Sequence, residues 1–245
     1  MSEPAHIVAL SGGKDSTALA LRMAEVWPEL DVTYFCSPTG DELPEMKEHW
    51  ARLEVMLNQP IVHITNGSLK SWSDHFEALP NFRMRWCTRL LKIEPCLAYM
   101  AKQPEGSTMY VGLRADEGTR EGIYSPNLVS RFPLREWGWG LREVRGYLKE
   151  RGVSIPKRTD CARCYGQRIG EWWELWDLHP ELYADAEDQE LRTGHTFRSA
   201  ARDSWPAGLK ELREQFELGR TPRGVLQEPL FEDNDVETGC RVCKL

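Results

Sequence analysis

The first two thirds of the chain alternate between short apolar runs and longer stretches in which apolar residues recur every three or four positions. The short runs predict buried strands at residues 6–11, 32–37, 61–64 and 109–113, and the longer stretches predict helices at 16–27, 44–57, 87–101 and 141–151. Strands and helices therefore follow one another in turn. This order predicts an α/β fold in which a parallel twisted sheet carries helices on both faces.

The pattern changes after about residue 156. From there the chain contains a cysteine pair, a Trp-rich helical segment at 171–177, acidic helical stretches and a polar tail with a second cysteine pair. We therefore predict an α/β domain over residues 1–156 and a mostly helical, cysteine-bearing region over residues 157–245. No apolar run approaches the roughly 18 residues that span a membrane, and the N-terminus lacks the features of a secretion signal, so we expect a cytoplasmic protein without membrane contact.

Charge is distributed unevenly along the chain. The net charge is −7, yet residues 81–170 hold 17 Lys and Arg against 9 Asp and Glu, a balance of +8, which leaves −15 for the remainder. A basic segment within an acidic protein favours a local anionic ligand, with solvated helix faces as the alternative. If a nucleic acid is the substrate, Trp86, Trp137 and Trp139 are the stacking surfaces that this segment offers.

The first predicted strand leads into Ser-Gly-Gly-Lys-Asp-Ser at residues 11–16 and then into a helix. The spacing does not match a Walker A loop, because Asp15 follows Lys14 and Val8 stands where the first glycine of that loop belongs. The third glycine of a dinucleotide-binding fingerprint is missing as well. The strand, turn and helix are nevertheless the setting in which an anion binds at a helix N-terminus.

We predict that this loop cradles the pyrophosphate part of a nucleotide. Its glycines let backbone amides approach phosphate oxygens, its serines add hydroxyl donors, Lys14 adds a cation, and Asp15 either caps the helix or helps to hold Mg²⁺. The predicted nucleotide-binding residues of the loop are Ser11, Gly12, Gly13, Lys14, Asp15 and Ser16. An ordinary glycine-rich turn is the alternative.

The loop after an N-terminal strand resembles the signature of the PP-loop ATP pyrophosphatases, which have the adenine nucleotide alpha hydrolase-like fold. The resemblance implies that ATP binds here and is cleaved between its α- and β-phosphates, so that an adenylated substrate forms and pyrophosphate leaves. Members of this superfamily use the activated substrate for amidation, ligation or sulfur transfer. The resemblance therefore implies the activation step and leaves the product open.

Four further segments resemble the PAPS and adenylyl-sulfate reductases, and together with the loop they cover residues 6–165. They are a Thr-Gly-x-x-x-Pro-Glu turn at 39–45, a Cys-x-x-x-x-Lys-x-x-Pro helix start at 87–95, a Gly-x-Arg segment at 112–114 and a Pro-Leu-x-x-Trp element at 133–137. The arginine of the third segment faces the nucleotide in those enzymes. The resemblance thus implies that Gly112 and Arg114 belong to the nucleotide site.

The sequence departs from those reductases in two respects. They have a degenerate first loop and a Glu-Cys-Gly-Leu-His tail that carries their nucleophilic cysteine, whereas this sequence has the full loop and lacks that tail. It is more similar to the ATP-consuming relatives, such as those of DNA phosphorothioation systems. Those relatives combine an intact loop with an iron–sulfur cluster.

Two Cys-x-x-Cys pairs, Cys161 with Cys164 and Cys240 with Cys243, supply four thiolates at a spacing that suits one metal ion or cluster. Zn²⁺ and a [4Fe–4S] cluster both accept four such ligands, and the resemblance favours the cluster. By analogy with adenylyl-sulfate reductases, Cys87 is an alternative ligand. If the two pairs are the ligands, Cys87 lies at a helix start near arginines that favour its thiolate, and it becomes a candidate persulfide carrier.

These observations predict an ATP pyrophosphatase of the PAPS reductase family that adenylates a substrate for sulfur transfer, with ATP, Mg²⁺ and an iron–sulfur cluster. The predicted catalytic residues are Lys14, Asp15, Cys87 and Arg114, while Cys36 and Cys96 are expected in the core. The acceptor is either a small molecule or a nucleic acid, and a sulfur donor or a thioredoxin-like reductant is the expected partner. A sulfonucleotide reductase that produces sulfite and a non-catalytic nucleotide-binding redox or regulatory module are the alternatives, and the oligomeric state stays open.

Overall fold

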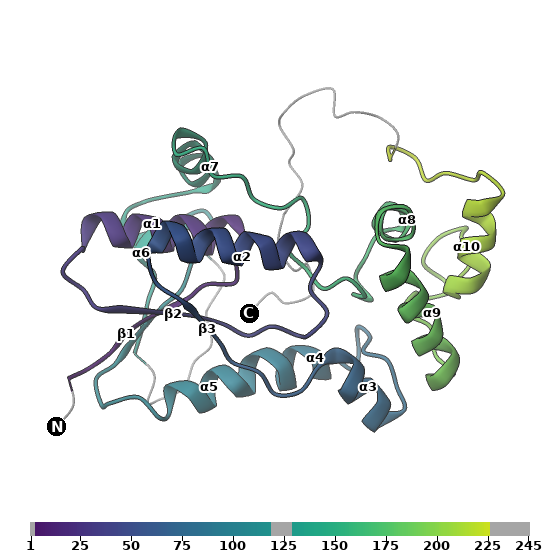
Figure 1. Ribbon diagram of the computed structural model, residues 1–245, viewed down its shortest axis with the longest axis horizontal. Coiled ribbons are helices and arrows are strands. Elements are labelled where there is room, and N and C mark those ends of the chain that lie inside the picture. The colour runs from purple at the N-terminus through teal and green to yellow at the C-terminus, as the bar shows by residue number, and fades with distance from the viewer. Residues whose placement is uncertain (1–2, 119–128, 226–245) are drawn as a thin grey trace.

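The computed structural model describes residues 3–118 and 129–225 (Figure 1). Its strands are β1 (His6–Ala9), β2 (Val32–Cys36), β3 (Ile61–His63), β4 (Thr108–Tyr110) and β5 (Val129–Arg131). Its helices are α1 (Lys14–Val26), α2 (Pro44–Leu57), α3 (Leu69–Phe76), α4 (Trp86–Thr88), the π-helical turn η1 (Arg89–Ile93), α5 (Glu94–Met100), α6 (Pro133–Glu136), α7 (Leu141–Glu150), α8 (Ile169–Leu178), α9 (Pro180–Thr193) and α10 (Leu209–Glu217). The predicted α/β fold is confirmed.

The described strands form one parallel sheet in the order β3-β2-β1-β4-β5. The chain moves outward from β1 through β2 to β3 and then returns to the other side of β1 with β4. In open α/β sheets, ligands bind at the carboxyl ends of the strands where the order reverses in this way. The loop after β1, at residues 10–13, therefore lies at the expected ligand site.

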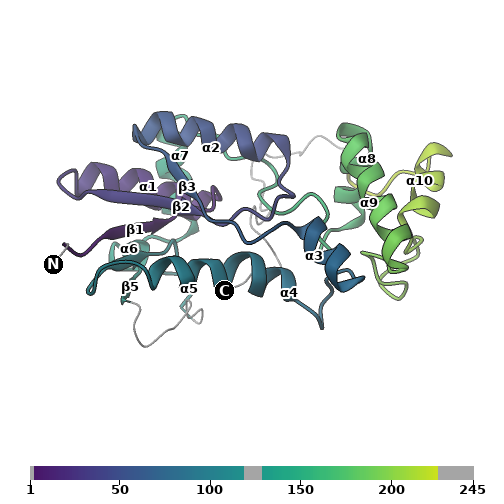
Figure 2. The same ribbon diagram turned by 60° about the horizontal axis from the view of Figure 1, so that its bottom comes forward.

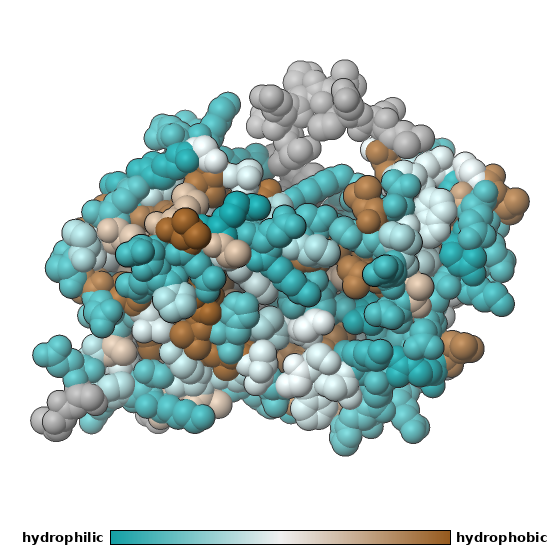
Figure 3. All heavy atoms as spheres, viewed as in Figure 1, coloured by the Kyte–Doolittle hydropathy of each residue, from teal (hydrophilic) through white to brown (hydrophobic). Residues whose placement is uncertain are grey.

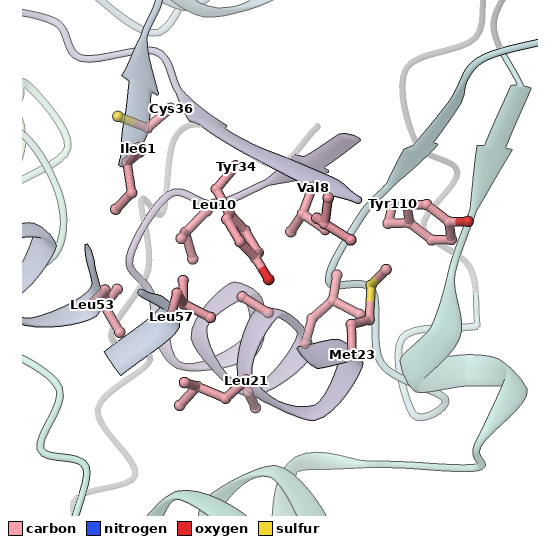
Figure 4. Close-up of a cluster of buried hydrophobic side chains, with 14 of the residues drawn as sticks. Val8, Leu10, Leu21, Met23, Tyr34, Cys36, Leu53, Leu57, Ile61 and Tyr110 are labelled. Carbon is pink, nitrogen blue, oxygen red and sulfur yellow. The ribbon is translucent and has the colours of Figure 1, made fainter. Parts of the chain in front are cut away.

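Helices cover both faces of the sheet (Figures 1 and 2). Helices α1, α2 and α7 lie on one face, and α5 with the helical segment before it lies on the other. Successive strand residues point to opposite faces, so that Val8 and Tyr34 join the cluster under α1 while Ile7 and Phe35 join the cluster over α5. Figure 4 shows the first cluster, in which strand side chains meet Met23 of α1. This packing holds the β1–α1 connection in place.

Helices α4 and α5 are joined by the π-helical turn η1, so the chain is helical from residue 86 to residue 100. A proline inside a helix lacks an N–H and clashes with the carbonyl four residues earlier. Here Pro95 follows a turn in which the N–H of Glu94 reaches back five residues to the carbonyl of Arg89. The wider turn accommodates the proline, and π-helical turns of this kind are frequent at functional sites.

The helices after residue 168 pack around a second hydrophobic cluster. Trp172 of α8, Tyr183 of α9 and Phe216 of α10 are buried in it, and Leu43 and Leu79 from the first part of the chain join them. The helical character predicted for this part is confirmed, whereas the boundary at residue 156 stays a prediction. Within the described ranges, every helix is too short or too polar to cross a membrane. The face seen in Figure 3 is mostly hydrophilic, with hydrophobic residues in separate small patches.

Candidate functional site

The loop between β1 and α1 is pressed against α2. Gly12 has a φ of +86°, and a Cβ atom added there would lie 2.3 Å from Cε of Met46 and 2.7 Å from Nε1 of Trp50. The indole N–H of Trp50 donates to the carbonyl of Ser11 over 3.1 Å. Only glycine combines the left-handed backbone with this close approach, so Gly12 has a steric reason as well as a chemical one.

Two serine hydroxyls hold the shape of the loop. Ser16 Oγ lies 3.0 Å from Ser11 Oγ, accepts a hydrogen bond from the Gly12 N–H at 3.2 Å and lies 3.1 Å from the carbonyl oxygen of Gly13, to which it donates. Gly13 is the N-cap residue of α1 and provides no side-chain cap, and the first N–H groups of a helix have no partner within the helix. The helix start therefore offers backbone donors to an anion, while Ser16 shapes the loop that presents them.

The loop after β4 packs directly onto the start of α1. A Cβ atom added to Gly112 would lie 2.9 Å from the backbone nitrogen of Ser16 and 3.0 Å from the carbonyl carbon of Asp15. Because both obstacles are backbone atoms, a larger residue at position 112 would displace the helix start. The structure thus brings together two segments that lie about a hundred residues apart in the sequence.

Arg114 and Asp15 form the charged part of this junction. Arg114 Nη1 lies 2.9 Å from Asp15 Oδ2, and Lys14 Nζ lies 3.6 Å from the same oxygen. Burial raises the pKa of Asp15, and the positive charges of Lys14 and Arg114 oppose that effect. The other carboxylate oxygen, Oδ1, is buried and has no hydrogen-bond partner within the described residues. An unpartnered carboxylate oxygen beside an anion site is a suitable ligand for Mg²⁺.

Neighbouring side chains fix the position of Arg114. Asp116 Oδ1 accepts from Arg114 Nε at 2.8 Å, and Asp116 Oδ2 accepts from the N–H of Leu141 at the start of α7. Arg135 of α6 donates to the carbonyls of Arg114 and Glu117 over 3.3 and 2.7 Å. Arg114 is thereby held with its guanidinium toward Asp15. Sequence reasoning named Arg114 but not the supporting side chains.

His49 of α2 is a buried residue that sequence reasoning missed. It is 1% exposed, and its ring lies against the backbone of Gly12. Burial, reinforced by the positive charge of Arg52, lowers the pKa of His49 to about 4, so the ring is neutral at pH 7. The register of α2 offers the only sequence signal: Met46, His49, Trp50 and Leu53 lie on its buried face.

The first Cys-x-x-Cys pair lies against the turn that follows β2. The N–H of Ala162 donates to the carbonyl of Asp41 at 2.6 Å, and Glu42 forms an antiparallel bridge with Cys161. Asp41 also accepts hydrogen bonds from the Arg163 backbone at 2.9 Å and from its guanidinium, and both side chains are at least 95% buried. Two motifs that the sequence shows separately are therefore one structural unit at the carboxyl edge of the sheet.

The thiols of this pair have identifiable neighbours. Cys161 Sγ lies 3.3 Å from Oγ1 of Thr39, and Cys164 Sγ accepts from the Gly166 N–H at 3.4 Å. Hydrogen bonds of this kind to sulfur are found around metal-bound thiolates. Arg202 donates to the carbonyls of Tyr165 and Gly166, both at 3.1 Å, which closes the turn from the other side.

The complete ligand sets lie partly outside the described residues, because Cys240 and Cys243 do. Within the ranges 3–118 and 129–225, no three His, Cys, Asp or Glu side chains gather as a metal site, so Cys87 does not join Cys161 and Cys164 in such a group. Cys87 is half-buried in α4. Cys36 and Cys96 are buried in the core as predicted, and burial raises their pKa values to about 12 and about 11.

Comparisons with known proteins identify the family and support the fold. Residues 5–157 match the model of the phosphoadenosine phosphosulfate reductase domain. Among solved structures, the fold is similar to that of a phosphoadenylyl-sulfate (PAPS) reductase from Candida auris, crystallised as a phosphate complex. The TM-score is 0.51 and the identity 16%, and the match covers 64% of this chain and 77% of that one. No curated protein sequence matches. At this identity the structural likeness shows the fold alone.

Proposed function

The chain belongs to the phosphoadenosine phosphosulfate reductase domain family, and from that premise we propose that it is an ATP pyrophosphatase that adenylates an acceptor for sulfur transfer. One observation carries the proposal: the intact loop at residues 11–16 presents an uncapped helix start, with Lys14, Asp15 and Arg114 beside it. Such a site suits a chain of phosphates better than a single sulfate or phosphate group.

The proposed reaction has two steps. A carbonyl oxygen of the acceptor attacks the α-phosphorus of ATP, the bond between this phosphorus and the bridging oxygen breaks, and pyrophosphate leaves. A sulfur donor at the oxidation level of hydrosulfide then attacks the activated carbon, and AMP departs with the former carbonyl oxygen while a proton is lost. The net change at the acceptor is the replacement of oxygen by sulfur.

The residues of the site have distinct roles in the first step. The amides at the start of α1 and Lys14 stabilise the charge that develops on pyrophosphate. Arg114 holds the α-phosphate or the acceptor, and its contact with Asp15 opens as the nucleotide takes the place of that carboxylate. Mg²⁺ held by Asp15 and phosphate oxygens would supply further charge neutralisation. His49 keeps the loop packed without adding a charge beneath it.

The Cys-x-x-Cys turn suits a metal centre, because two half-buried thiols share one hydrogen-bonded turn. We propose that Cys161 and Cys164, with Cys240 and Cys243, hold a [4Fe–4S] cluster that would bind the sulfur donor. We also propose that Cys87 carries a persulfide, from which a dithiol reductant of the thioredoxin type releases hydrosulfide: the dithiol is oxidised to a disulfide, the S–S bond of the persulfide breaks, and the Cys87 thiolate is restored. Anaerobically purified protein should then contain iron and absorb broadly in the visible range. Stoichiometric zinc in a colourless protein would contradict the cluster, and loss of iron in Cys87→Ser would make Cys87 a ligand instead.

Pyrophosphate release tests the central proposal. The full-length protein is incubated anaerobically with radiolabelled ATP, sulfide and candidate acceptors, and AMP and pyrophosphate are quantified. Lys14→Met should lower the rate at least about 100-fold, since it removes a charge that acts on the leaving group. Lys47→Met, on the exposed side of α2, is the matched control and should leave the rate unchanged.

A sulfonucleotide reductase is the second candidate, because the family model bears that description. It predicts that PAPS or adenylyl sulfate yields sulfite with thioredoxin and without ATP, and that outcome would replace our proposal. ATP binding without pyrophosphate release under any acceptor would instead favour a nucleotide-binding regulatory module.

A further inference from the structure

A set of aromatic and basic side chains lies next to Cys87 and next to the turn that carries Cys161 and Cys164. We define the aromatic–arginine surface as Trp72 and Phe76 of α3, Phe82, Arg83, Met84 and Arg85 of the following loop, and Trp86 of α4. Phe76 stacks on Trp72 with ring centroids 5.4 Å apart, and it lies at the same distance from Trp86. The rings thus form a continuous row.

Three apolar members of this surface are exposed, while Trp72 and Trp86 are half-buried. Phe82 is 64% exposed, Met84 51% and Phe76 41%. The side chain of Asn81 accepts from the N–H groups of Arg83 and Met84 at 2.9 and 3.0 Å, which fixes the turn. A fixed turn that presents a phenyl ring and a thioether to water points to a ligand for them.

The charge of this segment differs from that of the whole protein. The loop at residues 82–85 holds two arginines and no Asp or Glu, in a chain whose net charge is −7, while α3 contributes Asp74, which is paired with Arg192, and is followed by Glu77. Arg83 and Arg85 are exposed, and neither forms an ion pair with another described residue. Two cations without acidic partners beside exposed rings are complementary to a polyanion with aromatic groups.

The surface borders the proposed catalytic elements. Trp86 is followed immediately by Cys87, and the ring of Phe82 contacts Tyr165, next to Cys164, with centroids 5.0 Å apart. Asn66, in the loop after β3, accepts from Trp72 Nε1 through its carbonyl and donates through its side chain to the carbonyl of Leu90. Both halves of the surface are therefore anchored at the carboxyl edge of the sheet, where the nucleotide site lies.

We propose that the aromatic–arginine surface binds single-stranded nucleic acid and that this strand is the acceptor. Bases stack on Phe82 and on the Phe76–Trp86 row, Arg83 and Arg85 contact phosphates, and a base carbonyl is presented for adenylation. The role as acceptor rests on the proposed function, whereas strand binding does not. Of the tryptophans predicted for stacking, Trp86 belongs to this surface, but Trp137 and Trp139 pack on each other and on the core under α1.

Binding is measured first, without ATP. A fluorescein-labelled oligonucleotide of about 12 nucleotides, as DNA and as RNA, is titrated with the full-length protein, and anisotropy is followed at several salt concentrations. Phe82→Ala should weaken binding roughly 5- to 100-fold, as expected for the loss of one stacked base. The double variant R83Q/R85Q should weaken binding and reduce the slope of log affinity against log salt by about 1.4.

Controls separate this surface from general electrostatic attraction. Arg142→Gln, on the exposed side of α7, should bind like the unaltered protein, and R83K/R85K should keep the salt slope. The proposal is overturned if the unaltered protein does not bind either strand, or if Arg142→Gln weakens binding as much as R83Q/R85Q. It is also overturned if Phe82→Ala instead abolishes self-association seen by sedimentation, because the rings would then be a protein interface.

The acceptor role has its own readout. The bound oligonucleotide is added to the pyrophosphate-release assay, and release that depends on the strand and is lost in R83Q/R85Q supports it. Strand binding together with release that only a small molecule stimulates would refute the acceptor role and leave the ATP pyrophosphatase standing. Strand binding without any pyrophosphate release would refute the proposed function and leave the binding surface standing.

Discussion

Replacing Asp41 by asparagine tests how firmly the Cys-x-x-Cys turn is attached to the sheet. Asp41 accepts hydrogen bonds from the backbone and the guanidinium of Arg163, and the two side chains are 1% and 5% exposed. An arginine cannot release its proton to escape burial, so Asp41→Asn leaves an uncompensated positive charge. Removing one partner of a buried pair costs about 3 to 5 kcal/mol, whereas an exposed pair is worth about 1 kcal/mol or less.

Urea unfolding measures this cost. With an m-value of roughly 3 kcal/mol/M, a loss of 3 to 5 kcal/mol lowers the midpoint by about 1 to 1.7 M. Arg163→Met should cost less than Asp41→Asn, because the carboxyl group left behind can take up a proton. The double variant D41L/R163M should recover most of the loss, since a buried apolar pair carries no desolvation penalty.

The same variants report on the thiols. The backbone of Cys161 and Ala162 is hydrogen-bonded to the turn at residues 39–42. Loosening this attachment in Asp41→Asn should expose the thiols of Cys161 and Cys164 and speed their alkylation. A loss below about 1 kcal/mol in either single variant, or a loss in D41L/R163M as large as the two single losses together, would show that this pair does not attach the turn to the sheet.

Three further predictions concern the loop, the second core and the core thiols. Gly112→Ala should lower ATP affinity at least about tenfold, because the new Cβ atom would meet the backbone of α1. Gly146→Ala is the control, since there is open space around Gly146, and it should leave the affinity unchanged. Equal effects of the two variants in an ATP-binding titration would contradict this prediction. Burial raises the pKa of Glu190 from 4.5 to about 7, so the folded state binds the proton of this carboxyl group more tightly than the unfolded state does. The stabilisation that results is complete below pH 4.5 and is lost as the pH rises to about 7. The free energy of unfolding of the unaltered protein minus that of Glu190→Gln should therefore fall by roughly 3 kcal/mol between these pH values. A difference that does not change with pH would refute the raised pKa. Alkylation of the native protein at pH 8, followed by mass spectrometry, should leave Cys36 and Cys96 unmodified, and fast labelling of either would show that it is not a core thiol.

The pattern of apolar residues predicted most of the elements that build the sheet. The predicted helix at 44–57 coincides with α2, and the helix predicted at 87–101 is present as α4, η1 and α5. These segments have strong periodicity because one face of each packs on the sheet. Helix α3 and strand β5 were missed. Strand β5 is short and mostly exposed at the sheet edge, so it lacks an apolar run, and α3 has only two buried residues.

The sequence by itself determined the α/β class, the loop at residues 11–16 and the Cys-x-x-Cys spacing that places Cys161 and Cys164 in one turn. Each of these depends on residues that are close together in the chain, where backbone geometry limits the possibilities. Only the tertiary structure decided that Gly112 and Arg114 pack onto the start of α1, that Asp41 attaches the cysteine turn to the sheet, and that Phe82 meets Tyr165. These contacts join segments from about 80 to 120 residues apart, and they arise because parallel strands bring all their carboxyl ends to one edge.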